Sequence, residues 1–108
     1  MPKRGEIWWV RLDPSQGSEI AKTRPCVVLS VNVVNDHRRT IVVVPLSTSP
    51  TPHPPLLIPV TSGGKRVVAV VDQIRAVAKE RLVKRLDQLP LADMAALEHA
   101  IQQVLGLN

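Results

Sequence analysis

Hydroxyl and charged side chains gather at the ends of apolar runs in this sequence. Arg24 stands directly before the apolar run 25–31, and Ser47 and Thr48 directly follow the apolar run 40–46. If the two runs pair as an antiparallel hairpin, the start of the first lies beside the end of the second. An arginine beside hydroxyl donors is suited to a phosphate group, because its planar fork reaches two oxygens. The pattern therefore predicts an anion site at this edge.

Further polar side chains lie in the long polar segment 13–24 and around the end of the apolar run 67–74, and these are Glu19, Lys22, Thr23, Asp72, Gln73 and Arg75. Loops of about twelve residues in small domains are often functional, which makes the first segment a candidate for binding. A structural alternative stays open at this point. Arg24 can pair with Glu19 or Asp72, and the hydroxyl after the third apolar run can simply cap a turn.

The sequence lacks the residue patterns of several other chemistries. The three histidines, His37, His53 and His99, are not spaced as metal ligands, and Cys26 is the single cysteine. We therefore expect no metal centre and no cofactor. No phosphate-binding glycine loop, dinucleotide-binding pattern or nucleophile elbow occurs either. Cys26 is expected to be a small buried strand residue rather than a reactive thiol.

Charge points to a polyanionic partner. The 108 residues include 14 lysines and arginines against 9 aspartates and glutamates, a net charge of +5. Residues 86–108 contain three acidic side chains and no basic one, so residues 1–85 carry a net charge of +8. A basic body of this kind suits a nucleic acid. A basic surface without such a partner is the alternative.

Five predicted strands must hold these side chains in place. Each is a mostly apolar run bounded by proline, glycine or polar turn residues, and the runs are 7–12, 25–31, 40–46, 56–60 and 67–74. Pro59 places the fourth strand at a sheet edge. Residues 62–65 (SGGK) predict a turn, residues 32–36 a short helical turn, and residues 79–86 form a mixed basic segment without a clear pattern.

The first strand contains two adjacent tryptophans, which must point to opposite faces. Trp8 shares its face with Val10 and Leu12 and is expected in the core. Trp9 shares a face with an arginine, which favours an edge or an interface. Its indole is also suited to stacking on a nucleobase, although plain packing is the alternative.

One amphipathic helix is predicted over residues 91–105, where apolar side chains recur at three- and four-residue steps. Pro90 suits the start of this helix and Gly106 its end. About five strands closed by one helix predict a mainly β, α+β domain over residues 1–108, with a strongly curved sheet or partial barrel. No run approaches the ~20 apolar residues of a membrane span. No secretory signal opens the chain, so we expect a cytoplasmic protein.

Several blocks, in order along the chain, resemble the MazF/PemK/Kid family, the toxins of bacterial toxin–antitoxin modules. The blocks are GEIWWV at 5–10, DP at 13–14 with GSE at 17–19, RPCVVLS at 24–30, VPLST at 44–48 and DQIR at 72–75. The terminal helix with LGL at 105–107 also fits. The resemblance covers nearly the whole chain.

The resemblance implies an SH3-like partial barrel of about five to seven strands with a C-terminal helix, and a homodimer. It implies a metal-independent, often sequence-specific endoribonuclease (an mRNA interferase) that cleaves single-stranded RNA. A cognate antitoxin would inhibit it by placing a flexible acidic segment in the RNA groove. Catalysis would fall to Arg24 and Ser47, with Glu19 as a proton-transfer residue. One branch of the family uses an aspartate as base at the position of Asp72.

Two departures separate this chain from that branch. The branch has an arginine two residues before its aspartate and a histidine in its Gly-x-Glu block, where this chain has Val70 and Ser18. We therefore expect catalysis by arginine and a hydroxyl, with the choice between Ser47 and Thr48 left open. The residues expected to bind RNA are Arg11, Lys22, Thr23, Thr48, Asp72, Gln73 and Arg75.

In the expected reaction, the ribose 2′-OH attacks the adjacent phosphorus and the 5′-oxygen leaves. Arg24 would stabilise the charge that develops, and DNA, which lacks the 2′-OH, would not be cut. Two alternatives remain open. One is a non-enzymatic poison of DNA gyrase like CcdB, which shares the barrel. The other is a module that only binds RNA or DNA.

Overall fold

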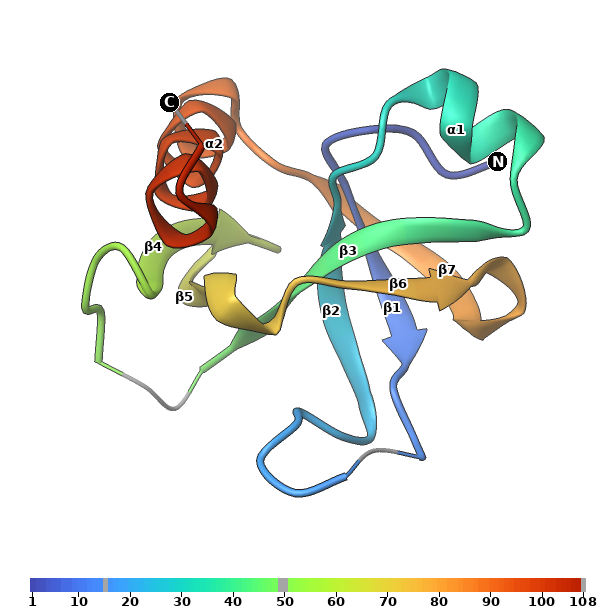
Figure 1. The fold of residues 1–108 in the computed structure, drawn as a ribbon, viewed down its shortest axis with the longest axis horizontal. Helices are drawn as coiled ribbons and strands as arrows, with labels where there is room; N and C mark the ends of the chain where they lie inside the picture. Colours follow the sequence, from blue (N-terminus) through green and yellow to red (C-terminus); the bar gives the residue numbers. More distant parts are fainter. Residues whose placement is uncertain (15, 49–50, 108) are drawn as a thin grey trace.

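The computed structural model describes residues 1–14, 16–48 and 51–107, and it shows a curled antiparallel sheet with one long helix (Figure 1). Its elements are β1 Glu6–Arg11, β2 Thr23–Val28, α1 Asn32–His37, β3 Thr40–Ser47, β4 Leu57–Ser62, β5 Lys65–Val70, the 3₁₀ turn η1 Val71–Gln73, β6 Arg75–Ala78, the 3₁₀ turn η2 Lys79–Arg81, β7 Leu82–Gln88 and α2 Leu91–Leu105. Ser15, Ser49, Pro50 and Asn108 lie outside the described residues.

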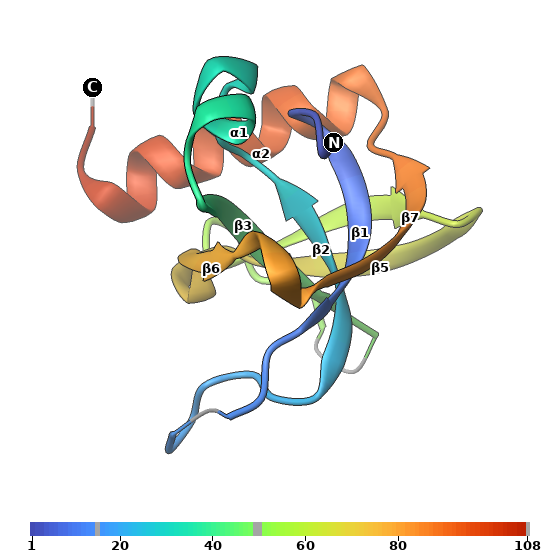
Figure 2. The same cartoon turned by 90° about the vertical axis from the view of Figure 1, so that its right-hand side faces the viewer.

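The sheet curls because β3 has different partners along its length. Its strand order is β4-β5-β3-β2-β1-β7, and β6 also pairs with β3. The start of β3, at residues 40–43, pairs with β6, while its last two residues pair with β5. The two partners diverge from this shared strand, and the sheet closes partly on itself (Figure 2). The predicted mainly β partial barrel with a C-terminal helix is confirmed.

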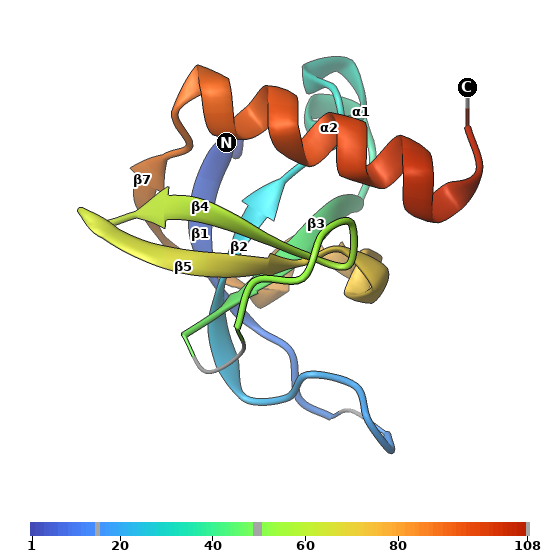
Figure 3. The ribbon, with the colours of Figure 1, turned by 90° about the vertical axis from the view of Figure 1, so that its left-hand side faces the viewer.

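Two hydrophobic clusters stabilise the fold, one on each side of β1, β2 and β3. The first lies between the sheet and α2, which crosses one face (Figure 3), and it includes Ile7, Val27 and Leu97. The second includes Val10 and Cys26. Successive strand residues point to opposite faces, so both faces of β2 are buried over residues 26–28, where its sequence is apolar. Each fully buried aliphatic side chain contributes about 1.5–3 kcal/mol.

The last helix is confirmed at its predicted bounds. Its C-cap, Gly106, has a φ of 70°, a left-handed conformation that glycine adopts without steric cost. Met94, Leu97 and Ala100 are buried against the sheet. Leu91, by contrast, is 87% exposed, although it belongs to the predicted apolar repeat. Among the described residues, no helix is both long enough and apolar enough to span a bilayer.

Two sequence-based assignments were wrong after residue 70. The predicted strand 67–74 ends at Val70, because the chain turns through η1 and then begins β6 at Arg75. The polar pair Asp72-Gln73 falls at this turn. The mixed segment 79–86 contains most of β7, which pairs with β1. That strand lies at the edge of the sheet and exposes its charged side chains, so its sequence shows no apolar run.

Candidate active site

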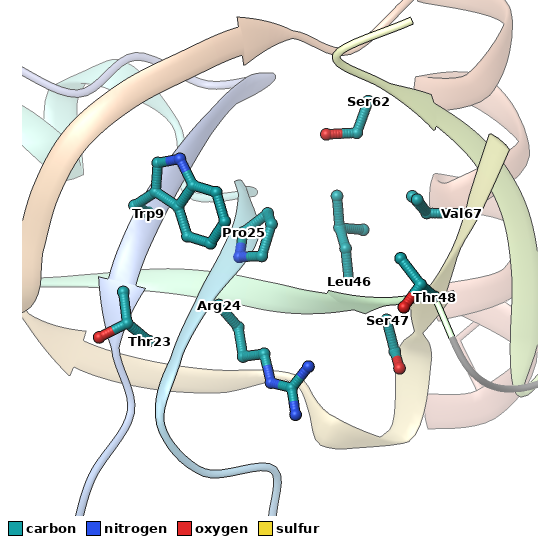
Figure 4. Close-up of a pocket in the computed structure, with 9 residues that line it drawn as sticks. All are labelled: Trp9, Thr23, Arg24, Pro25, Leu46, Ser47, Thr48, Ser62 and Val67. Carbon is teal, nitrogen blue, oxygen red and sulfur yellow. The ribbon is translucent and has the colours of Figure 1, made fainter. Parts of the chain in front are cut away.

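A cavity of about 180 Å³ opens where β2, β3 and the β4–β5 hairpin meet (Figure 4). Its lining residues come from five strands and the residue that follows β3, and they are Trp9, Thr23, Arg24, Pro25, Leu46, Ser47, Thr48, Ser62 and Val67. The predicted catalytic pair, Arg24 and Ser47, thus lies in one cavity together with the predicted RNA-binding residues Thr23 and Thr48.

The β2–β3 pairing explains why Arg24 and Ser47 meet. Cys26 lies opposite Pro45 in this antiparallel pair. Continuing the register by two residues along both strands brings Arg24 to the same end of the hairpin as Ser47. In Figure 4 the arginine side chain extends from β2 toward the end of β3. The predicted hairpin geometry is therefore present in the structure.

Arg24 has no acidic partner among residues 1–14, 16–48 and 51–107. The three ion pairs found there join Arg4 with Glu98, Arg66 with Asp93, and Arg85 with Glu6. Arg24 is half-buried, and its Nε donates to the Ala21 carbonyl over 3.4 Å. The structural alternative, in which Arg24 pairs with Glu19 or Asp72, is not found. A half-buried guanidinium without a carboxylate is suited to an incoming anion.

The hydroxyl side of the cavity holds both Ser47 and Thr48. Ser47 is half-buried at the end of β3, whereas Thr48 is exposed. Both can donate to a non-bridging phosphate oxygen. Within the described chain, no cluster of three or more His, Cys, Asp or Glu side chains is arranged to hold a metal ion.

The wall of the cavity is apolar. Trp9, Pro25, Leu46 and Val67 supply it. Trp9 is half-buried, but β1 pairs with β2 and with β7, so Trp9 does not lie at a sheet edge. Trp8 is also half-buried, packs against the second cluster and donates from Nε1 to Glu6. An indole beside aliphatic groups suits the face of a nucleobase.

Sequence reasoning missed Ser62 and Val67 as lining residues. The sequence places Ser62 only in a turn and Val67 only in a strand. The signal that could have found them is the pairing of β5 with the end of β3, where Ser47 lies opposite Val68. That pairing joins distant parts of the sequence and is not visible in its local pattern.

Glu19 is not brought together with Arg24 and Ser47. It is exposed and lines a different cavity, of about 310 Å³, with Arg75 and Arg81 among its other lining residues. Its Oε1 accepts a hydrogen bond from the Gln16 amide over 2.7 Å. The carboxylate therefore closes a turn within its own loop.

Three of the predicted RNA-binding residues lie outside the lining of the first cavity and are exposed. Arg11 donates from Nη2 to the Glu80 carbonyl over 3.2 Å. Lys22 has a φ of 66°, and its amide donates to Oδ1 of Asp13 over 2.9 Å. Asp72 lies on η1.

Gln73 and Arg75 bind the backbone of the long loop instead of lining the first cavity. Gln73 Oε1 accepts from the Ile20 amide over 3.2 Å, and Arg75 Nη2 donates to the Ile20 carbonyl over 2.7 Å. Both side chains are half-buried. Arg75 also lines the second cavity, with Glu19.

Cys26 is completely buried beneath this region, as predicted. Burial raises the pKa of its thiol to about 12, and the positive charge of Arg75 offsets only part of that effect. A thiol with so high a pKa holds its proton at neutral pH and is a poor nucleophile. Cys26 is a packing residue in this fold.

Comparison with known proteins gives the same family as the blocks in the sequence. Residues 3–105 match the family described as PemK-like, MazF-like toxin of type II toxin-antitoxin system. The chain is 37% identical over 116 residues to endoribonuclease MazF9 of Mycobacterium tuberculosis, covering 99% of this chain and 98% of that protein. It is 30% identical over 114 residues to endoribonuclease MazF of Staphylococcus epidermidis, covering 100% and 94%.

Solved structures show the same fold. MazF from Deinococcus radiodurans superposes with a TM-score of 0.85 at 24% identity, covering 97% of this chain and 96% of that one. A mycobacterial endoribonuclease in complex with its cognate antitoxin superposes with a TM-score of 0.83 at 24% identity, covering 100% and 98%. With the family match extending over residues 3–105, the chain belongs to the PemK-like, MazF-like toxins of type II toxin–antitoxin systems.

Proposed function

We propose that this chain is the toxin of a toxin–antitoxin module and a metal-independent endoribonuclease that cleaves single-stranded RNA. The observation that carries the proposal is the cavity in which Arg24, free of any acidic partner in the described chain, lies with the hydroxyls of Ser47 and Thr48. Two relatives named endoribonucleases, at 37% and 30% identity over nearly whole chains, support an RNA-cleaving toxin.

The proposed reaction is a transesterification within the RNA. The ribose 2′-oxygen forms a bond to the adjacent phosphorus, the bond to the 5′-oxygen breaks, and the products are a 2′,3′-cyclic phosphate and a 5′-hydroxyl. The 2′-OH loses a proton and the leaving oxygen gains one. Since RNA supplies the nucleophile, the step needs neither a metal-bound water nor a covalent intermediate.

Arg24 stabilises the charge that develops on the phosphorane in this proposal. A preorganised donor aimed at such charge typically contributes ~10²–10³ in rate. Ser47 or Thr48 donates a hydrogen bond to a non-bridging oxygen. Arg24 is proposed to act through its charge and its hydrogen-bond donors, not by proton transfer.

Glu19 is the proposed proton-transfer residue, and its position sets a condition on that role. Its carboxylate binds the Gln16 amide and lines the second cavity. For Glu19 to reach a 2′-OH beside Arg24, the exposed loop would have to rearrange when RNA binds. Glu19→Gln should then lower the cleavage rate by ~10²–10⁴. An unchanged rate would exclude Glu19 as the base.

The remaining surface is proposed to bind RNA by charge and by stacking. The apolar wall around Trp9 takes a base next to the scissile phosphate, and Thr23 and Thr48 supply hydrogen bonds at the rim. Arg11 and Lys22 are exposed basic residues near the loop and suit the backbone phosphates. Sequence preference would come from the loops on either side of the cavity.

Three further properties belong to the proposal. The chain acts as a homodimer, a cognate antitoxin inhibits it by placing an acidic segment against Arg24, and its mRNA substrate places it in the cytoplasm. The complex of a mycobacterial relative with its antitoxin supports such a partner. Competition between an acidic antitoxin segment and RNA follows from the site's chemistry, since both would bind the same guanidinium.

The gyrase poison is the second function that the fold permits, and it is not favoured. A protein that acts only by binding gyrase has no need of an arginine and a hydroxyl in one cavity. If Arg24→Ala stayed fully toxic in cells while the purified protein bound gyrase, the poison would replace the ribonuclease.

The test is cleavage of a mixed-sequence RNA by purified, antitoxin-free protein in excess chelator. We expect products ending in 2′,3′-cyclic phosphate and 5′-hydroxyl, and none with Arg24→Ala. Folded protein that leaves the RNA intact would contradict the proposal. A binding-only module would give the same negative result but would still retain RNA affinity.

A further inference from the structure

In the long segment between β1 and β2, the backbone of Ile20 is bound by side chains from the sheet. Its amide and its carbonyl are both bound, by Gln73 and Arg75, at 3.2 and 2.7 Å. Gln73 closes η1 and Arg75 opens β6. Two side chains from one short stretch thus fix the backbone on both sides of one residue, and the Ile20 side chain packs on the second hydrophobic cluster.

The anchoring stretch is itself fixed to the sheet. Arg75 lies opposite Val43 in the β3–β6 pair, and Val43 is fully buried. Val77, two residues further along β6, is also buried in the second cluster. Ile20 is therefore bound to a part of the protein that packs directly into the core.

Three residues of backbone connect Ile20 to Arg24. The carbonyl of Ala21, next to Ile20, accepts the hydrogen bond from Arg24 Nε over 3.4 Å. The next residue, Lys22, has a left-handed conformation that two hydrogen bonds hold in place. Its amide donates to the Asp13 side chain, and its carbonyl accepts from the Leu12 amide. Arg24 has no ion pair in the described chain that would orient it independently. Its direction therefore depends on where the loop places Ala21.

We propose that Gln73 and Arg75 are positioning residues, which hold Ile20 so that the segment 20–22 aims Arg24 into the cavity. This inference rests on the proposed function and revises the expectation that both side chains bind RNA. Neither side chain lines the first cavity, and each uses a polar atom to bind the backbone of the loop. A misplacement of about 1 Å in a reacting group can lower a rate about 10²-fold, so loss of the anchor should affect turnover.

The experiment compares variants that remove or keep each hydrogen bond. Gln73→Met removes the acceptor for the Ile20 amide, and Gln73→Glu keeps an acceptor oxygen. Arg75→Met removes the donor, and Arg75→Lys keeps one. Arg38→Met, an exposed arginine at the end of α1, is the control for the loss of one positive charge.

Two quantities separate positioning from phosphate binding. One is the single-turnover cleavage rate at saturating RNA. The other is the salt dependence of Kd for the same RNA with a 2′-deoxy substitution at the mapped cleavage site. Positioning predicts a cleavage rate about 10- to 100-fold lower in both methionine variants. Gln73→Glu should largely restore this rate. The salt slope of Arg75→Met should equal that of Arg38→Met.

If Arg75 instead binds a phosphate, its loss should change RNA affinity and not the cleavage rate. Arg75→Met would then keep its rate at saturation, bind RNA more weakly and lose about 0.7 from the salt slope relative to the control. That result would overturn the inference. If Arg75→Met does not fold, the Gln73 variants carry the test, because Gln73 is half-buried on η1 and is not part of either hydrophobic cluster.

Hydrogen exchange of the Ile20 amide gives a readout that does not depend on catalysis. We expect Gln73→Met to speed this exchange by about tenfold or more, and Arg24→Ala to leave it unchanged. Unchanged exchange in Gln73→Met would overturn the inference even if the wild type cleaves RNA. If the wild type cleaves no RNA, the proposed function fails, while the exchange still reports whether the anchor exists.

Discussion

Arginines near α2 and β7 bind carboxylates, whereas arginines around the β1–β2 loop bind backbone carbonyls. Arg4 and Arg66 pair with Glu98 and Asp93 of α2. Around the β1–β2 loop, which extends away from α2 at the bottom of Figure 1, Arg24 donates to the Ala21 carbonyl and Arg75 to that of Ile20. A carboxylate neutralises a guanidinium, but a neutral carbonyl leaves its charge in place.

The difference explains the charge asymmetry of the sequence. The acidic residues of the last segment, which contains no lysine or arginine, include the two that pair with arginines near α2. The arginines around the β1–β2 loop bind neutral carbonyls and keep their positive charge. Arg81 follows the same rule as its neighbours, since its Nη1 donates to the carbonyls of Arg11 and Asp13. Arginines paired with carboxylates and arginines bound only to carbonyls thus lie in different regions of the fold.

The largest effect should come from Arg24→Ala. We expect the rate of RNA cleavage to fall by ~10²–10³, because the charge on the phosphorane loses its donor. The melting temperature should stay within a degree or two, since Arg24 makes no ion pair in the described chain. Arg66→Ala, which removes an arginine paired with a carboxylate, is the matched control and should keep full cleavage. Equal losses in both variants would remove the distinction between the two groups of arginines.

The hydroxyls should give the next largest effect. Loss of one donor to a phosphate oxygen is expected to lower the rate by ~10². Ser47→Ala and Thr48→Ala, compared in single-turnover assays, identify which hydroxyl acts. We expect Ser47→Ala to show the larger loss, because Ser47 is half-buried beside Arg24 and Thr48 is exposed. The reverse order would transfer the role to Thr48.

At the helix end, Asp93→Ala should reduce stability and leave cleavage unchanged. Asp93 accepts from the Thr61 amide at 2.8 Å and pairs with Arg66 at 3.5 Å, so it joins α2 to β4. Loss of such a bond costs about 1–2 kcal/mol, measurable by urea unfolding. Arg66→Ala should cost less, about 0–1 kcal/mol, because the pair is exposed. A cleavage defect in Asp93→Ala at a temperature where it is fully folded would contradict this assignment.

The smallest effect should appear in acid. Burial raises the pKa of Glu6, but hydrogen bonds from Trp8, the Lys3 amide and Arg85 outweigh it, and the net pKa is lowered from 4.5. A lowered folded-state pKa stabilises the fold above the unfolded value, and this stability is lost as pH falls through the folded value. Glu6→Gln should therefore lower the melting temperature at pH 7 and flatten its decline below pH 4.5. An identical pH profile in both proteins would rule out this contribution.

The β2–β3 hairpin was predictable because local patterns determine it. Both faces of β2 and β3 are buried, so each strand appears as an apolar run, and Arg24 and Ser47 flank those runs. The helix was equally clear, from its periodic apolar residues and the glycine that ends it. Resemblance to a known family added the barrel and assigned the chemistry.

The features that the sequence did not predict depend on contacts between segments far apart in the chain. β7 is charged because it lies at an edge, and only its pairing with β1 makes it a strand. The bonds of Gln73 and Arg75 to Ile20 span more than 50 residues of sequence. No local pattern predicts a glutamine that accepts from a loop amide rather than binding RNA. Glu19 is a similar case, since the turn with Gln16 keeps it in another cavity.

The most direct test is single-turnover cleavage, in excess chelator, of one RNA and of its copy with a 2′-deoxy substitution at the mapped site. Wild-type protein should cut the RNA to a 2′,3′-cyclic phosphate, bind both with similar Kd and leave the substituted site intact. Arg24→Ala should bind both and cut neither at a comparable rate. Cleavage at the 2′-deoxy position, or full activity in Arg24→Ala, would contradict the account of a phosphate held by an unpaired arginine and attacked by the RNA's own hydroxyl.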